Sequence, residues 1–489
     1  MAAQAVFLED RGSVRRWLVE HLAGCIGRGE LVPGERLPPI RAMAGWLGVS
    51  RDTVARAYED LADRGMVEAV VGRGTFVADA GGAEGPAPAW APRVARLVEL
   101  HRARATLPVS EGAVALHRLV PDPSLFPTDA FRRALLRALR RSGSSVLSYA
   151  PPQGELGLRR VLARRFERAG MAVAEDEVVL CHGASQGISL ALRLFAEPGD
   201  AIAVEEPTYG NVLATLAALG LEAVPVPMTQ EGPDPVELEA ALGRPGVKAF
   251  YTIPSFHNPL GTSMTIGRRR EVLAIAAAAG KPVIEDAYQM DLHHEGQGAP
   301  TLFSLDRDGR VVHLYSFSKS LFPGVRVGSI AARGRLVEGL VALKHATHLS
   351  DALPLQAGLA EFLREGSYDR HLRRVRRVLR ARACALVAAL GQVMPRGVRF
   401  TRPEGGFQLW LELPEALDSA ELLPEAARAG VLFAPGRLFL VDGRPSPGMR
   451  LGFAQADLPA IDRGVRALAS VIRRRLEQPV PSQTEVLQV

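Results

Sequence analysis

Hydrophobic residues follow two different patterns in two parts of the chain. Between residues 13 and 65, apolar side chains recur at the spacing of three short helices, and the run MVEAVVGRGTFVA then has the pattern of two strands. Beyond residue 115, apolar runs alternate with amphipathic helices, which is typical of a mostly parallel sheet with helical crossovers. The sequence therefore predicts an α/β domain preceded by a small helical domain. The clearest strands of the α/β domain are EVVLCHG, AIAVEEP, VKAFYTI, KPVIEDA and VVHLYSF.

The N-terminal helices have the organisation of a helix-turn-helix. Gly48 is a natural C-terminal cap for the second helix and Ser50 an N-terminal cap for the third, so a tight turn joins the two. The run from LPPIRAMAGWLGVS to GRGTFV resembles the winged-helix domain of GntR-type regulators. That resemblance implies DNA contacts from Arg41, Ser50, Arg51, Thr53, Arg73, Gly74 and Thr75. The first helix has apolar spacing at Val14, Trp17, Leu18, His21, Leu22 and Cys25.

Two charged residues on the third helix have more than one interpretation. Arg56 is a further candidate for a DNA contact. Asp52 either reads a cytosine amino group or stabilises the positive N-terminal end of the helix.

Lysine is rare in this chain, which directs attention to Lys319. The sequence has four lysines, whereas arginine supplies nearly all of the positive charge. A guanidinium cannot form an imine with an aldehyde, so a lysine kept between two serines after VVHLYSF is a candidate Schiff-base residue. The alternative is a solvated lysine at an ordinary strand-to-loop junction.

Polar residues also follow other predicted strands. Asp286 ends a buried strand, where an unpaired carboxylate is costly, so it should have a cationic partner. Tyr209 could stack on a planar ring or pack in the core, and Asn258 could donate to a ring oxygen or belong to a tight turn. The helix that begins near Ser185 could bind an anion through its backbone amides. Together with Lys319, these groups match the requirements of pyridoxal 5′-phosphate (PLP).

The chain from about residue 115 to about residue 475 resembles the fold-type I aminotransferases. The matching motifs are YAPPQGELGLR, GASQ, EPTY, HNPLG, EDAY, SFSKSLFPGVRVG, PEGGFQLW and MRLGFA; GASQ departs from the family's GSQQ. The resemblance implies that Asp286 pairs with the pyridine nitrogen, Tyr209 stacks on the ring, and Asn258 and Tyr288 contact the ring oxygen. It assigns the phosphate to Ser185, Gln186, Ser316, Ser318 and Arg326, a contact from a second subunit to Tyr149, and an α-carboxylate to Arg450.

Composition and charge limit the remaining possibilities. With 489 residues, 47% of them hydrophobic, the chain is globular and too long for one typical domain. Residues 1–77 carry ten arginines against ten acidic residues, so a DNA signal must come from the arrangement of charge. No membrane span or signal peptide is recognisable, which predicts a cytoplasmic protein. The three cysteines fit neither a disulfide framework nor a metal site, and we expect reduced packing residues.

These features predict four segments and one overall function. Residues 10–78 form the winged helix, 79–114 a linker, 115–475 the aminotransferase-like domain and 476–489 a flexible tail. This organisation resembles the MocR/GabR branch of GntR regulators. The resemblance implies a domain-swapped homodimer on double-stranded DNA, in which PLP or an amino compound acts through an aldimine at Lys319. The alternative is a working transaminase with an accessory DNA-binding domain, in which Lys319, Asp286 and Tyr209 would be catalytic.

Overall fold

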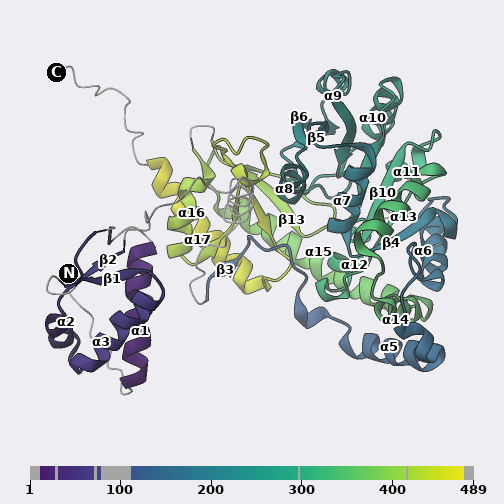
Figure 1. Ribbon diagram of the computed structural model, residues 1–489. Helices are drawn as coiled ribbons and strands as arrows, with labels where there is room; N and C mark the ends of the chain where they lie inside the picture. Colours follow the sequence, from purple (N-terminus) through teal and green to yellow (C-terminus); the bar gives the residue numbers. More distant parts are fainter. Residues whose placement is uncertain are drawn as a thin grey trace. The chain divides into compact units, whose positions relative to one another are not determined.

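The computed structural model describes residues 11–27, 31–32, 34–70, 74–78, 112–295, 298–414 and 417–477. The chain divides into two compact units, Met1–Arg102 and Ala103–Val489 (Figure 1). The predicted linker lies outside the described residues as far as residue 111, and the predicted tail does so from residue 478 onwards. The boundaries proposed for these two segments therefore stay predictions.

The N-terminal unit consists of three helices and a two-stranded wing. Gly48 ends the second helix in the left-handed conformation, and the Ser50 hydroxyl accepts a hydrogen bond from the Thr53 amide at 3.2 Å, as the sequence predicts. Trp17 and His21 do not join the core, because they lie exposed on the first helix and stack on each other at 4.9 Å. The elements are α1 (Arg11–Gly27), α2 (Ile40–Leu47), α3 (Arg51–Asp63), β1 (Val67–Val70) and β2 (Gly74–Val77).

An eight-stranded sheet forms the centre of the second unit. Its strand order is β4-β11-β10-β9-β8-β5-β6-β7, and the neighbours from β10 to β6 pair in parallel. The five strands named from the sequence are β4, β5, β8, β9 and β10, which confirms the predicted mostly parallel α/β fold. The strands are β4 (Val178–Cys181), β5 (Ala201–Glu206), β6 (Glu222–Thr229), β7 (Gly232–Pro233), β8 (Val247–Thr252), β9 (Val283–Asp286), β10 (Val311–Ser316) and β11 (Gly328–Ala331).

Helices cover both faces of this sheet (Figure 1). In β4, Val178 and Leu180 enter one hydrophobic core while Val179 and Cys181 enter the other. Burial on both faces explains why these strands read as continuous apolar runs. One core includes α7 (Ala184–Phe195), α8 (Gly210–Leu219) and α13 (Arg335–His348); the other includes α5 (Thr128–Ser142), α6 (Leu156–Arg168), α9 (Pro235–Leu242), α10 (Ile266–Ala278), α11 (Leu302–Leu305) and α14 (Leu353–Arg364).

A smaller C-terminal subdomain contains a second sheet of order β12-β13-β16-β15. The strand β3 (Val114–Ala115) begins at the last residue of the predicted linker. It pairs in parallel with β14 (Val431–Leu432) and packs against α17 (Leu458–Glu477), so it belongs to this subdomain. The remaining elements are β12 (Arg399–Phe400), β13 (Gln408–Glu412), β15 (Ala434–Pro435), β16 (Gly448–Gly452), α12 (Phe317–Ser320), α15 (Ser367–Val393), α16 (Ser419–Arg428), α17 (Leu458–Glu477), and the 3-10 turns η1 (Pro123–Leu125), η2 (Gly143–Leu147), η3 (Glu175–Glu177), η4 (Pro323–Val325) and η5 (Gly436–Phe439).

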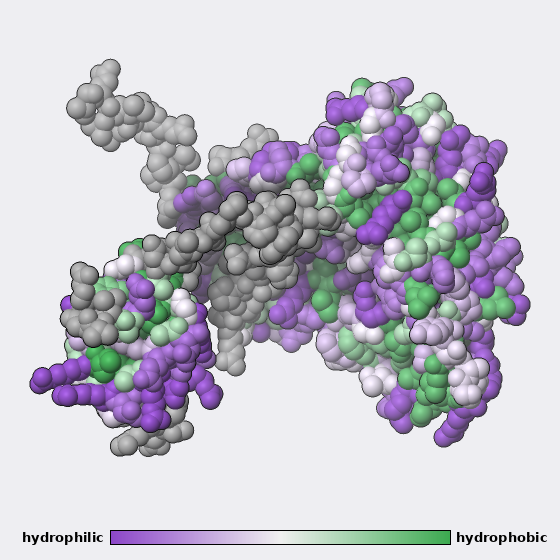
Figure 2. Space-filling model, in the orientation of Figure 1, coloured by the Kyte–Doolittle hydropathy of each residue, from purple (hydrophilic) through white to green (hydrophobic). Residues whose placement is uncertain are grey.

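Hydrophilic residues cover much of the visible surface of the described parts (Figure 2). Across those parts, every helix is too short or too polar to cross a bilayer. Cys181 is a buried packing residue, as expected, but Cys384 is exposed on α15, so the prediction of a packing role is wrong for that cysteine.

Candidate functional site

The predicted cofactor residues gather at one edge of the large sheet. Asp286 is the last residue of β9, and Lys319 lies on α12 directly after β10. Tyr209 and Asn258 follow β5 and β8, two further strands of the same parallel set. Because the carboxyl ends of parallel strands meet at one edge, strand order brings these side chains together from distant parts of the sequence.

Lys319 has the properties of a reactive amine. Its side chain is partly buried, and Nζ donates a hydrogen bond to the backbone carbonyl of Leu119 at 2.5 Å. Burial lowers the pKa of Lys319 to about 8, and the positive charges of Arg450 and Arg326 act in the same direction. Roughly a tenth of this amine is therefore unprotonated at pH 7, and the unprotonated form is the one that attacks an aldehyde.

Asp286 is a buried carboxylate that binds neutral donors. Its two oxygens accept hydrogen bonds from the Tyr251 hydroxyl at 2.7 Å and the Tyr288 amide at 3.2 Å. Burial raises the pKa of Asp286 to about 6, although these hydrogen bonds oppose the rise. Among the described residues no side-chain cation pairs with it, so the predicted cationic partner is not a side chain of this part of the chain. A protonated ring nitrogen would supply that positive charge.

A turn that is suited to an anion, which we call the anion-binding turn, lies at the start of α7. Gly183 precedes this helix with a φ of 77°, and a Cβ added there would lie 3.4 Å from Arg326 Nη1 and from Ser318 Oγ. The turn therefore brings a guanidinium, a hydroxyl and the first amides of a helix to one place. Gln186 Nε2 and Ser318 Oγ are buried without a hydrogen-bond partner among the described residues. Phosphate oxygens are acceptors that would satisfy such donors.

Two other serines predicted for the phosphate differ in their surroundings. Ser185 is exposed in the first turn of α7. Ser316 is buried, and its hydroxyl accepts a hydrogen bond from the Ser318 amide at 3.2 Å, so it caps α12. Their phosphate contacts stay predictions.

Arg450, on β16, presents a guanidinium that suits a carboxylate. It donates to Asn258 Oδ1 and to the His117 carbonyl, both at 2.9 Å, and it lies 4.9 Å from the centre of the Phe439 ring. No carboxylate within the described ranges pairs with it, and its Nε has no hydrogen-bond partner there. Burial lowers the pKa of Arg450 to about 10, so the group stays charged at neutral pH.

Several residues of the site were missed by the sequence analysis. Tyr251, which holds Asp286, and Gln408, which donates to the Tyr288 hydroxyl at 3.2 Å, both lie inside strands. A polar group in an otherwise apolar strand, as in VKAFYTI and FQLWLE, is the signal that could have found them. The carbonyls of His117 and Leu119 leave no such signal, because every residue has a carbonyl.

Tyr209 and Thr208 occupy the turn between β5 and α8. Tyr209 lies at the N-cap position of α8 and is partly buried. Burial lowers the pKa of Arg450, and electrostatic interactions with Tyr288 and then Tyr209 oppose that change, so Tyr209 lies near Arg450. Thr208 is fully buried, and its hydroxyl has no partner among the described residues, so it is a further donor at this edge.

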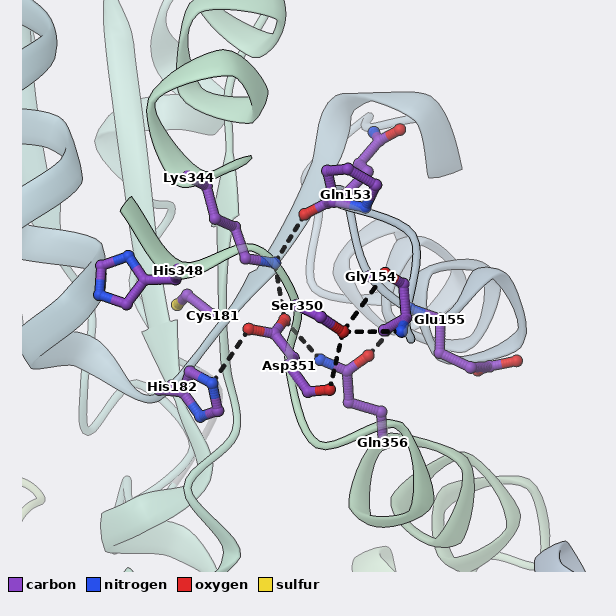
Figure 3. Close-up of polar contacts among 12 residues, drawn as sticks. Gln153, Gly154, Glu155, Cys181, His182, Lys344, His348, Ser350, Asp351 and Gln356 are labelled. Carbon is purple, nitrogen blue, oxygen red and sulfur yellow. Dashed lines mark hydrogen bonds and ion pairs between the residues drawn. The ribbon is translucent and has the colours of Figure 1, made fainter. Parts of the chain in front are cut away.

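Tyr149 stands on a loop tied to the anion-binding turn. The Tyr149 side chain is 78% exposed, so it is placed to meet another molecule. In the same loop, the Pro152 carbonyl accepts a hydrogen bond from Lys344 Nζ at 2.7 Å. Lys344 also pairs with Asp351 at 2.6 Å, and the other oxygen of Asp351 lies 3.2 Å from His182 Nε2 (Figure 3). This buried network fixes the loop of Tyr149 relative to the residue that precedes Gly183.

The predicted DNA-contacting residues lie on α2, at the start of α3 and in the wing. Arg41 and Arg51 are exposed and form no ion pair within the described residues, whereas Arg56 pairs with Asp52 at 3.1 Å. The ion pair favours the helix-stabilising role of Asp52 and leaves Arg41 and Arg51 as the available cations. Ser50 and Thr53 share a hydrogen bond of 2.8 Å between their hydroxyls.

The wing adds a residue that the sequence analysis did not name. Thr75 lies in β2, and Arg73 lies outside the described residues. Gly74 has a φ of 117°, and a Cβ there would lie 2.8 Å from Arg36 Nε. Glycine at this position therefore lets the exposed Arg36 lie against the wing backbone.

Comparisons with known proteins agree with both halves of this description. Residues 16–77 match the family of bacterial regulatory proteins of the gntR type, and residues 122–468 match the aminotransferases of class I and II. The uncharacterized HTH-type transcriptional regulator YjiR of Escherichia coli (strain K12) is 32% identical, over 93% of this chain and 98% of its own. The probable rhizopine catabolism regulatory protein MocR of Rhizobium meliloti is 31% identical, over 94% and 93%. The chain belongs to the MocR-type GntR regulators.

A solved structure shows the fold of the second unit of this regulator. LysN, the α-aminoadipate aminotransferase of Thermus thermophilus, superposes with a TM-score of 0.71 at 31% identity, over 79% of this chain and 99% of LysN. LysN was crystallised with N-(5′-phosphopyridoxyl)-L-leucine. The predicted family, fold class and role as a DNA-binding transcriptional regulator are thus confirmed.

Proposed function

We propose that this regulator binds PLP at Lys319 and that PLP, or an amino compound at the same site, sets its affinity for DNA. The observation that carries the proposal is the arrangement at the sheet edge. An amine with a pKa of about 8 lies at the same edge as a buried carboxylate that has no side-chain cation as partner among the described residues. The anion-binding turn at Gly183 lies at the same edge.

The polar groups at this edge suit the parts of this cofactor. Asp286 would hold the ring nitrogen, and Asn258 and Tyr288 the ring oxygen. Arg326 and the start of α7 would hold the phosphate, with Ser185, Gln186, Ser316 and Ser318 as further contacts. Tyr209 would stack on the ring. When bound, PLP supplies an aldehyde that condenses with a primary amine and releases water.

Lys319 and Arg450 would receive the amino compound. The unprotonated Lys319 amine can take up a proton at Nζ, and Arg450 would orient a carboxylate through the N–H groups that it now directs to Asn258 and His117. An amino acid or a related amino carboxylate is therefore the class of effector that the site suits.

A homodimer would complete this site. The loop of Tyr149 is joined to Ser350 by a hydrogen bond of 2.7 Å from the Ala150 amide, and its neighbours Leu147 and Leu349 are 70% and 54% exposed. We infer that this apolar surface meets a second copy and that Tyr149 enters the partner's site. A domain-swapped arrangement would then give two winged helices on paired half-sites.

A second candidate function is transamination. The residues that move a proton and bind a carboxylate are all present, and burial keeps the pKa of Lys319 in the range of a proton carrier. Sustained conversion of amino to keto acids, together with undetectable sequence-specific DNA binding, would favour this function over regulation.

Spectroscopy of the full chain tests the cofactor proposal. Titration with PLP should give a visible absorption band that survives dialysis, both in the natural protein and in Lys248→Arg, a control whose ion pair with Asp200 an arginine can keep. Lys319→Arg keeps the charge but not the amine, so the band should vanish. An unchanged band in Lys319→Arg, with a native circular dichroism spectrum, would contradict the proposal.

A further inference from the structure

The first residues after the predicted linker cross the cofactor site before the large sheet begins. We call residues 116–121 the strap. The Leu119 carbonyl accepts a hydrogen bond from Lys319 Nζ at 2.5 Å, and the His117 carbonyl accepts one from Arg450 Nη2 at 2.9 Å. The strap therefore holds, through its backbone, the two cations that a cofactor and a carboxylate would use.

The beginning of the strap is attached to the C-terminal subdomain. The Gly452 amide donates to the Leu116 carbonyl at 2.5 Å, and the Val114 amide donates to the Gly430 carbonyl at 2.8 Å. A Cβ added to Gly452 would lie 2.6 Å from the carbonyl oxygen of Arg118, so the strap lies directly on β16. Residues 114–118 must therefore move with β14 and β16.

Lys319 is attached to the other part of the unit. It lies on α12, which follows β10 in the centre of the large sheet. The hydrogen bond between Lys319 and Leu119 is thus a tie between the large sheet and the subdomain that holds β3. Beyond the strap, Asp122 forms an ion pair of 2.6 Å with Arg382 on α15, which fixes the far end.

We propose that the strap transmits occupancy of the Lys319 site to the C-terminal end of the linker. This inference rests on the proposed function and specifies how the site would regulate. A cofactor that engages the Lys319 amine leaves the Leu119 carbonyl without its donor, and a carboxylate on Arg450 competes with the His117 carbonyl. One of the ties between the large sheet and the subdomain is then lost, while others, such as the hydrogen bond between Gln408 and Tyr288, remain. This loss favours movement of the subdomain together with β3. Since β3 begins at the C-terminal end of the linker, this motion changes where the chain from the winged helix enters the second unit.

Hydrogen exchange of the full chain, with and without PLP, tests the strap directly. A visible absorption band establishes that PLP is bound. Loss of the tie should then speed amide exchange in peptides that cover residues 114–121, because the exchange of an amide follows the local opening of its hydrogen bonds.

A glycine pair tests whether the strap carries the coupling to DNA. Gly452→Ala should displace the strap through the Arg118 carbonyl and reduce the PLP-dependent change in DNA affinity at least threefold. Coupling between two sites usually amounts to roughly 5–150-fold. Gly391→Ala is the control, because a Cβ there meets nothing within 4 Å. If Gly452→Ala does not fold, Asp122→Asn replaces it, because this change weakens the ion pair with Arg382 at the far end of the strap. The exchange experiment uses the natural protein, so it tests the strap even if neither variant folds.

The outcomes separate this inference from the function on which it rests. A bound-PLP band with unchanged exchange in residues 114–121 overturns the strap while the cofactor proposal stands. The absence of any band overturns both. Faster exchange in the strap, together with reduced coupling in Gly452→Ala, supports the proposal.

Discussion

Burial changes the pKa of two residues of the site in opposite directions. The pKa of Lys319 falls to about 8 and that of Asp286 rises to about 6, because in each case a charged form is removed from water. Burying the charged form of either group destabilises the protein without ligand. A ligand that reacts with the amine or brings a positive charge to the carboxylate would remove that cost.

For Asp286, this argument predicts a measurable dependence of stability on pH. The folded-state pKa lies above the ordinary value of 3.8, so the folded state binds more protons, and the stabilisation present below pH 3.8 is lost as the pH rises through about 6. The total loss is roughly 3 kcal/mol, of which roughly half falls between pH 5 and pH 8. Without PLP, Asp286→Asn should therefore gain stability relative to the natural protein as the pH rises from 5 to 8.

Urea unfolding at the two pH values is the measurement for this prediction. Asp129→Asn is a suitable control, because the Asp129 side chain is 77% exposed and should change little. Asp286→Asn should also bind PLP more weakly. A variant that loses stability relative to the natural protein between pH 5 and pH 8 would show that the carboxylate is not a cost to the apo protein.

At this scale the sequence predicts side chains better than backbone groups. Lys319 could be named because lysine is rare in this arginine-rich chain, and Asp286 because an unpaired carboxylate at the end of a buried strand is costly. The structural role of Tyr251 depends on its neighbour on β9, which only the strand pairing shows. The carbonyls of His117 and Leu119 have no sequence signal at all.

The elements of the winged helix follow from local chemistry. Gly48 and Ser50 mark the turn because one adopts the left-handed conformation and the other caps α3, and both effects depend on residue type alone. The contact of Arg36 with Gly74 joins a loop to a strand, so periodicity could not reveal it. The sequence thus predicts the helices and the wing, but not which cation lies against the wing.

The start of α3 gives a prediction about DNA binding. Arg51 is exposed there and forms no ion pair within the described part of the chain, so Arg51→Ala should weaken binding to DNA from upstream of the protein's own gene. If Arg51 contacts a phosphate, the slope of log affinity against log salt should fall by about 1. Fluorescence anisotropy at several salt concentrations measures this, with Arg64→Ala, at the opposite end of α3, as the control. Equal affinities and equal slopes for the two variants would remove Arg51 from the DNA interface.

On the scale of the whole molecule, one chain carries two units. The proposed function couples them through the Lys319 site of the second unit. Composition and motifs could predict both domains, because each has its own periodicity and its own core. The connection between them could not be predicted, since β3 joins the C-terminal subdomain through a pairing with β14, a strand more than three hundred residues further along the chain. Ligand and DNA can influence each other only if each binds the alternative conformations of this shared structure with different affinities.

The most direct test of this account is the affinity of the full chain for its operator DNA, measured with and without PLP in the natural protein and in Lys319→Arg. We predict that PLP changes the dissociation constant of the natural protein by roughly 5–150-fold, the usual range for coupled sites, and leaves that of Lys319→Arg unchanged. The same DNA affinity in the natural protein with and without PLP, while the visible band shows that the cofactor is bound, would contradict the account.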